Sequence, residues 1–147
     1  MNLGQMTLVI LAAILFSIFI LAVFNNLINQ MEQSVIHLYI TQGLKLADQV
    51  FQEYEAQILS RNMSFDDVFN ALENGVVRSP VTLAGAEYTV RIVSQVSNAQ
   101  GITIGGSLVD HQRIDVQVRI VAGERQYDVG RDDPAFSKVF SRFEITG

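Results

Sequence analysis

The stretch Met6–Phe24, MTLVILAAILFSIFILAVF, decides how this chain folds. Among its 19 residues only Thr7 and Ser17 are polar, and both hydroxyls can bond back to carbonyls of their own helix. At about 1.5 Å of rise per residue, a helix over this stretch covers roughly 28 Å, close to the ~30 Å thickness of a membrane's hydrocarbon layer. The stretch therefore predicts a helix long and apolar enough to span a membrane.

The charges of the chain lie outside this stretch. Residues 1–44 contain no Lys or Arg and a single acid, Glu32, whereas residues 45–147 hold all ten basic residues and carry a net charge of −4. This division excludes a uniformly soluble globule, and a single long apolar segment excludes a polytopic membrane protein. Because the N-terminal side lacks Lys and Arg, the orientation in a membrane is weakly specified.

A cleaved secretory signal peptide is the alternative interpretation of the apolar stretch. It would need a basic N-terminal region, a shorter apolar core and a cleavage site between small residues. This sequence has no basic N-terminal region, and no clear cleavage site follows Phe24. We therefore expect the span to be retained.

The helical pattern continues beyond the span through residues 25–61, and no proline occurs before Pro80. The apolar positions recur at helical spacing, at Leu27, Ile28, Met31, Val35, Leu38, Ala47, Val50, Phe51, Tyr54 and Ile58. We expect one helix from about Leu3 to about Leu59, a length typical of a coiled coil, a membrane span or a helical assembly. The stretch Val35–Ile40 is apolar on nearly all sides, so partners must cover it.

Gly43 interrupts this pattern and allows two interpretations. A glycine inside a helix costs about 1 kcal/mol relative to alanine, so it can be a tolerated weak point. It can equally permit a close approach of another helix or a bend. The sequence favours neither.

The rest of the chain predicts a small α+β head. Ser64 can cap a short helix over FDDVFNALENG, with Asp66 and Asp67 at its positive end and Gly75 after its last turn. Its apolar residues form one buried face, which consists of Phe65, Val68, Phe69 and Leu72. The sequence thus divides into a hydrophobic helix at 1–25, an amphipathic continuation at 26–61 and a globular head at 62–147.

Two segments of the head alternate between apolar and polar residues, as antiparallel strands with one solvent-exposed face do. Tyr88–Val96 places Arg91 outward, and Ile114–Ile120 places Asp115, Gln117 and Arg119 outward. Shorter strands are expected at Val81–Leu83, Gln126–Val129 and Arg142–Thr146, and a small hairpin in the loop Ser97–Arg113. The predicted fold class is α+β: a long N-terminal helix followed by a small antiparallel sheet.

The sequence offers little for catalysis or cofactors. The chain has no Cys, which excludes disulfide scaffolds and thiolate chemistry, and an isoelectric point near 4.8 argues against nucleic acid as the main partner. His37 is interpreted as a packed residue and His111, beside Asp110, as part of a surface loop. Asp128, Asp132 and Asp133 could bind a hard cation, but their spacing favours a turn of solvated charges. Asn62-Met63-Ser64 fits the N-glycosylation triplet. We expect no enzyme activity, cofactor or metal.

The expected layout, a long apolar N-terminal helix that continues into a small antiparallel head, resembles that of type IV pilins and the related pseudopilins. The resemblance covers the whole architecture and is carried by two features. The run Gly4-Gln-Met-Thr-Leu-Val-Ile-Leu-Ala-Ala-Ile-Leu is similar to the family's N-terminal motif, and Tyr88–Val93 with Gln112–Val118 is similar to two strands of minor-pilin heads. Where the family has an early glutamate this chain has Gln5, Val9 and Ile10, and it lacks the basic residues before the processing glycine. Either Met1 is the mature start, or the chain keeps its N-terminus.

The resemblance implies a structural subunit of an extracellular helical filament at the cell surface, anchored in the membrane before assembly. Its partners would be identical subunits in a homopolymer and the pilus-assembly machinery. The residues expected to pack between subunits are Met6, Leu8, Ile10, Leu11, Ile14, Leu15, Phe16, Phe19, Ile20, Phe24, Leu27, Met31, Val35 and Leu38. The polar residues expected to set subunit register are Gln5, Thr7, Asn25 and Asn26.

Two other functions remain open at this stage. One is a secretion-system pseudopilin, which forms a short polymer and would have nearly the same sequence features. The other is a single-span membrane protein whose extracytoplasmic head binds or senses a ligand. That second function predicts a pocket in the head.

Overall fold

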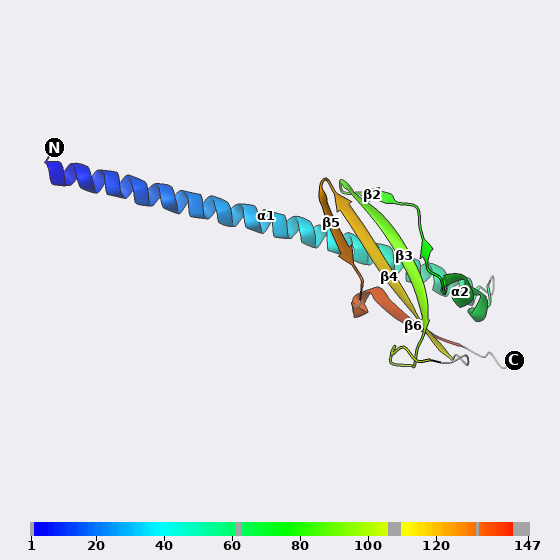
Figure 1. Ribbon diagram of the computed structural model, residues 1–147. Coiled ribbons are helices and arrows are strands. Elements are labelled where there is room, and N and C mark those ends of the chain that lie inside the picture. Colours follow the sequence, from blue (N-terminus) through cyan, green and yellow to red (C-terminus); the bar gives the residue numbers. More distant parts are fainter. Residues whose placement is uncertain (1, 61–62, 106–109, 132, 143–147) are drawn as a thin grey trace. The chain divides into compact units, whose positions relative to one another are not determined.

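A computed structural model of the chain describes residues 2–60, 63–105, 110–131 and 133–142. The chain forms two compact units, Met1–Leu38 and Tyr39–Gly147. A long helix α1 (Leu3–Leu59) is followed by a small antiparallel sheet, so the predicted α+β fold class is confirmed (Figure 1). The expected bounds of the long helix, from about Leu3 to about Leu59, are also confirmed.

The sheet belongs to the second unit and is antiparallel throughout. Its central pair, β3 (Ala86–Val96) and β4 (His111–Ala122), runs in register from Glu87 opposite Val121 to Val96 opposite Gln112. Shorter strands line both sides of this pair (Figure 1). On β3 lie β1 (Val76–Val77) and β2 (Val81–Leu83), and on β4 lie β5 (Arg125–Val129) and β6 (Ser137–Ser141).

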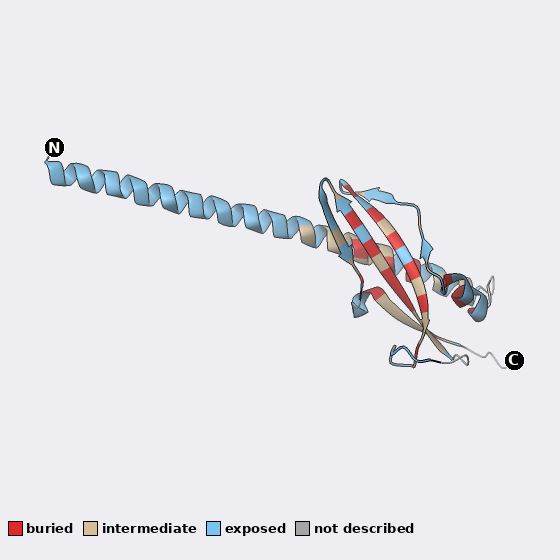
Figure 2. Cartoon of the chain, viewed as in Figure 1, coloured by how far each residue is buried: buried red, intermediate tan, exposed pale blue. Residues whose placement is uncertain are grey.

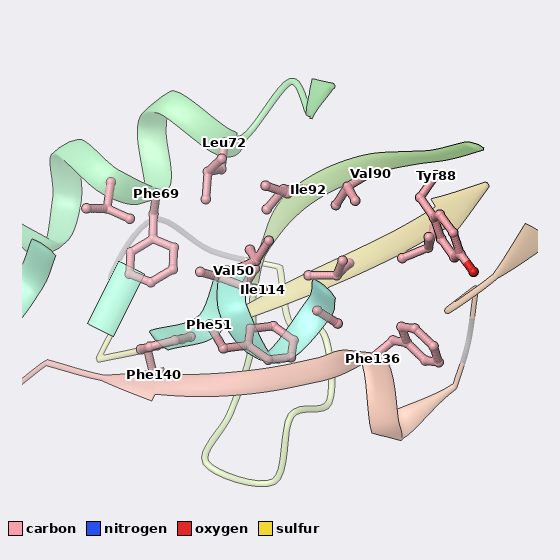
Figure 3. Close-up of a cluster of buried hydrophobic side chains, with 14 of the residues drawn as sticks. Val50, Phe51, Phe69, Leu72, Tyr88, Val90, Ile92, Ile114, Phe136 and Phe140 are labelled. Atoms are coloured by element: carbon pink, nitrogen blue, oxygen red, sulfur yellow. The ribbon is translucent and has the colours of Figure 1, made fainter. Parts of the chain in front are cut away.

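The core of this unit lies between the inner face of the sheet and two helical segments. Buried and more exposed residues alternate along most of β3 and β4, as the sequence predicts (Figure 2). The exception in β4 is Asp115, which was expected to point outward and is buried between Ile114 and Val116. From the second part of α1, Ala47, Val50 and Phe51 join the buried cluster (Figure 3). The helix α2 (Phe65–Leu72) contributes its predicted apolar face, Phe65, Val68, Phe69 and Leu72, all of them buried.

Three ion pairs connect the helical segments to the strands and loops around the sheet. In each pair the cation also lies over an aromatic ring, with 5.2–6.0 Å between the charged group and the ring centroid. The pairs are Arg78 with Glu53 at 2.7 Å, Lys138 with Glu55 at 2.8 Å, and Arg142 with Asp66. All are partly exposed, so each contributes little individually, typically about 0.2–1 kcal/mol.

A strand near the end of the chain was not predicted from the sequence: the last described strand, β6, is Ser137–Ser141. Another strand was expected at Arg142–Thr146, of which only Arg142 is described. Arg142 follows β6, and residues 143–147 lie outside the described residues. The short strand β1 was not predicted, because two exposed valines carry no alternation. In the loop expected to hold a hairpin, Ser97 and Thr103 form one antiparallel bridge.

Candidate functional site: the exposed apolar helix

The first unit is a helix whose large apolar side chains, apart from the partly buried Ile36, are solvent-exposed within the single chain. The exposed fractions of these exposed side chains range from 38% at Ile20 to 82% at Leu3. Within the described residues, α1 is the one helix long and apolar enough to cross a membrane. Every residue predicted to pack between subunits is exposed, namely Met6, Leu8, Ile10, Leu11, Ile14, Leu15, Phe16, Phe19, Ile20, Phe24, Leu27, Met31, Val35 and Leu38.

This exposure extends around the whole circumference of the helix. Four consecutive residues, Leu8 to Leu11, are large, apolar and more than half exposed. Consecutive residues of a helix point about 100° apart, so four of them cover every direction. A helix that is apolar on all sides is stable only inside a membrane or among other protein segments. The first unit is therefore incomplete without lipid or a partner.

The polar groups of this helix are bonded within the helix itself. Thr7 Oγ1 donates to the Leu3 carbonyl at 3.0 Å, and Ser17 Oγ donates to the Ala13 carbonyl at 2.8 Å, as predicted from the sequence. Gln5 Oε1 accepts a bond from the Asn2 amide at 3.4 Å. The hydroxyls of Thr7 and Ser17 need no external hydrogen-bond partner, so they can enter an apolar environment at little cost.

The other two residues predicted to set subunit register lie just beyond the span. Asn26 Oδ1 accepts a bond from Gln30 Nε2 at 3.4 Å, and Asn25 is exposed. The register role of Gln5, Thr7, Asn25 and Asn26 remains a prediction.

A second apolar stripe follows the membrane-length stretch. It consists of Leu27, Ile28, Met31, Val35 and Leu38, which are 44–69% exposed. The helix from Leu3 to Leu38 is roughly 54 Å long at 1.5 Å per residue, well beyond the ~30 Å that a hydrocarbon layer covers. A membrane alone therefore leaves this stripe in contact with water.

The residues considered for catalysis lie in ordinary structural roles. His111 is the first residue of β4 rather than part of a surface loop, and its Nδ1 lies 2.8 Å from Ser141 Oγ. His37, expected to be packed, is exposed in the single chain. The described part of the chain contains no group of three or more His, Cys, Asp or Glu that could hold a metal ion.

Two acidic residues of the turn that the sequence suggested as a cation site, Asp128 and Asp133, form hydrogen bonds within the chain. Asp128 accepts a hydrogen bond from Arg119 Nε at 2.9 Å, and this bond lowers the pKa of the Asp128 carboxyl. Asp133 Oδ1 accepts a bond from the Ala135 amide at 2.9 Å and so begins the short 3₁₀ helix η1 (Pro134–Phe136). Asp132, and Asn62 of the glycosylation triplet, lie outside the described residues.

The second unit also has two open clefts, of about 570 and 640 Å³, on the outer face of the sheet. Arg91, Gln117 and Arg131 are among the residues that line them. Strand alternation in the sequence places Arg91 and Gln117 outward. Alternation does not reveal that Arg91 and Gln117 share a cleft with Arg131. Arg131 follows β5, and its position beside them depends on the order of the strands in the sheet.

No protein-family model, no curated protein and no solved structure matches this chain.

Proposed function

We propose that this chain is the structural subunit of a type IV pilus-like filament, polymerised through its N-terminal helices. Before assembly the subunit is anchored in the membrane, and the assembled filament is extracellular, at the cell surface. The observation that carries the proposal is the helix Leu3–Leu38, which exposes large apolar side chains over nearly twice the thickness of a hydrocarbon layer.

Side-by-side packing of identical helices covers both parts of this surface. The membrane-length part exchanges lipid for neighbouring helices, and the second apolar stripe exchanges water for them. Burial of one Leu, Ile or Phe side chain contributes roughly 1.5–3 kcal/mol where water is displaced. A repeated contact between two different surfaces of the same chain generates an open helical polymer when the rotation between successive subunits does not close into a ring.

The partners in this proposal are identical subunits and a pilus-assembly machinery that extracts them from the membrane. The resemblance to type IV pilins and pseudopilins supports the proposal through the layout and through the run that begins at Gly4. A short secretion-system pseudopilus uses the same helix packing. It differs in the length of the polymer.

Electron microscopy of the purified full-length chain after removal of detergent tests the proposal. We expect filaments from the wild type and none from Ala13→Glu, because an unpaired carboxylate in a water-free core costs at least a few kcal/mol in every subunit. Gln49→Glu adds the same group at an exposed position of the same helix and should leave filaments intact. Normal filaments from Ala13→Glu would contradict the proposal.

Cross-linking separates packing between subunits from simple membrane insertion. The chain has no Cys, so single cysteines can be introduced without background. Met31→Cys lies in the centre of the second apolar stripe, and Gln33→Cys lies on the opposite side of the helix. With a short bis-maleimide we expect ladders of oligomers from Met31→Cys and far fewer from Gln33→Cys. Equal cross-linking of both variants would count against helix packing through the stripe.

A membrane-anchored binding domain is the second candidate. The clefts on the outer face of the sheet favour it, since that function requires a pocket in the head. It predicts monomers in detergent micelles and no filaments under any condition. The microscopy above therefore distinguishes the two candidates.

A further inference from the structure

The register of β3 and β4 brings two arginines together on the outer face of the sheet. Arg91 lies opposite Gln117, and Thr89 lies opposite Arg119. Residues at these positions point to the same face, so Arg91 and Arg119 are diagonal neighbours, with about 7–8 Å between their Cα atoms. This part of the outer face thus brings two positive charges together in a chain whose net charge is −5.

These residues line a cleft of about 570 Å³, a volume in the range of small-molecule sites, which are roughly 300–1,000 Å³. Polar groups around it can donate hydrogen bonds, and Val77, which lies opposite Arg91, supplies apolar surface. The donors are Asn74, Thr89, Arg91, Gln117, Arg119 and Arg131. Such a set of polar donors suits a small polar ligand.

The charges in the cleft do not cancel. Arg119 is bound to Asp128, the one carboxylate among the described lining residues, with 2.9 Å between Nε and Oδ1. Within the described residues, no ion pair involves Arg91 or Arg131. Two guanidinium groups therefore face the cleft with no compensating carboxylate among the residues that the structure describes.

Packing holds one of these guanidinium groups in place. A Cβ atom added at Gly75 would lie 3.1 Å from Arg91 Nε, so the guanidinium rests against the backbone just after α2. Arg91 therefore also has a packing contact with this part of the backbone. Arg131 has no such second role in the described structure, which makes it the decisive residue for a test.

We infer that this cleft binds a small molecule through an oxyanion group, a carboxylate or a phosphate, held by Arg91 and Arg131. Guanidinium groups bind planar oxyanions through two parallel charge-assisted hydrogen bonds, and Gln117 and Asn74 can add neutral donors. The inference concerns the second unit alone. It therefore does not depend on whether the chain forms filaments.

The test is an NMR titration of the isotope-labelled full-length chain in non-ionic detergent at low salt. Inorganic phosphate and galacturonate are added separately, and the Nε–Hε resonances of the arginines are followed. We expect saturable shifts at Arg91 and Arg131, with at least tenfold weaker binding in Arg131→Gln. Lys45→Gln removes the same charge from an exposed position on α1 and should bind like the wild type.

The two probes identify the group that is recognised. Saturation by phosphate alone assigns a phosphate ligand, and saturation by galacturonate alone assigns a carboxylate. Linear shifts with both probes, or equal loss in Arg131→Gln and Lys45→Gln, would overturn the inference. Shifts that grow with protein concentration without added probe, and vanish in Arg131→Gln, would instead identify a carboxylate of a neighbouring copy and would also overturn it.

Discussion

Gly43 lies where α1 packs on the inner face of the sheet. A Cβ atom at this position would lie 3.5 Å from Val129 Cγ2 and 3.8 Å from both Ile120 Cδ1 and Val118 Cγ1. The close approach suggested by the sequence is therefore an approach to strands of the same chain, β4 and β5. The distances are those of ordinary van der Waals contact, so the site has room for one methyl group and little more.

Substitutions at Gly43 test this packing. We expect Gly43→Ala to raise the stability of the second unit by about 0.5–1 kcal/mol, because alanine favours the helix and its methyl group meets no clash. Gly43→Leu should lower stability by about 1–3 kcal/mol, because the extra atoms displace the three neighbours. Thermal unfolding followed by circular dichroism measures both. Destabilisation by Gly43→Ala would show that the backbone cannot accept any side chain here.

Asp115 shows which residue properties the sequence cannot predict. Strand alternation places Asp115 on the outer face, yet only 8% of it is exposed. Two residues surround its carboxylate: Arg113 Nη2 donates to it at 2.9 Å, and Ser137 Oγ donates at 2.7 Å. Arg113 is two positions away, but Ser137 comes from β6. Burial at this position depends on a distant strand, which alternation alone does not reveal.

At the scale of elements, α2 was predictable because its signals are local. Ser64 Oγ accepts a hydrogen bond from the Asp67 amide at 3.1 Å, and Asp67 in turn accepts one from the Ser64 amide at 3.4 Å. This reciprocal capping box satisfies two amides that the start of a helix leaves unpaired. The buried face of α2 follows from the apolar spacing over eight residues.

The capping box predicts a measurable loss of stability when the Ser64 side chain is replaced. We expect Ser64→Ala to lower the stability of the second unit by about 1 kcal/mol, within the usual range of 0.5–2 kcal/mol for a lost N-cap. Ser64→Asp keeps an acceptor at the cap and should lose less. Chemical denaturation of both variants measures the difference. Equal stability of Ser64→Ala and the wild type would mean that α2 is held by its buried face alone.

The strands were predictable to different degrees for physical reasons. β3 and β4 pair with strands on both sides, and apolar and polar residues alternate strictly over Tyr88–Ile92 and Ile114–Ile120. The strand β6 has only five residues and follows η1, whose start depends on the Asp133 cap. Residues 137–141 do not alternate between apolar and polar side chains, so the pattern alone did not predict this strand.

At the scale of the whole molecule, the sequence predicted one long helix but not which surfaces it contacts. Ala47, Val50 and Phe51 lie on one apolar face, and a helical period cannot distinguish a sheet of the same chain from a neighbouring copy. The structure places these residues in the core of the second unit. That unit begins at Tyr39, within the segment 26–61 that the sequence describes as the continuation of the helix.

This division predicts which fragments fold. We expect residues 39–147 to give a soluble protein with a cooperative thermal transition, because the fragment keeps the whole buried cluster. Residues 62–147 lack Ala47, Val50 and Phe51, and burial of the Val and Phe side chains alone is worth roughly 1.5–3 kcal/mol each. Circular dichroism and NMR dispersion of both fragments measure the difference. A well-folded 62–147 fragment would show that α1 is dispensable for the sheet.

The hydroxyls of Thr7 and Ser17, each bound to a carbonyl of its own helix, have a mechanical consequence. Between Met6 and Phe24 the helix offers its neighbours apolar groups alone, so this part has no directional bonds to break when it slides. If such segments form the core of a fibre, one subunit can shift along another and exchange equivalent contacts. The fibre would then lengthen under tension by sliding of its subunits rather than by rupture.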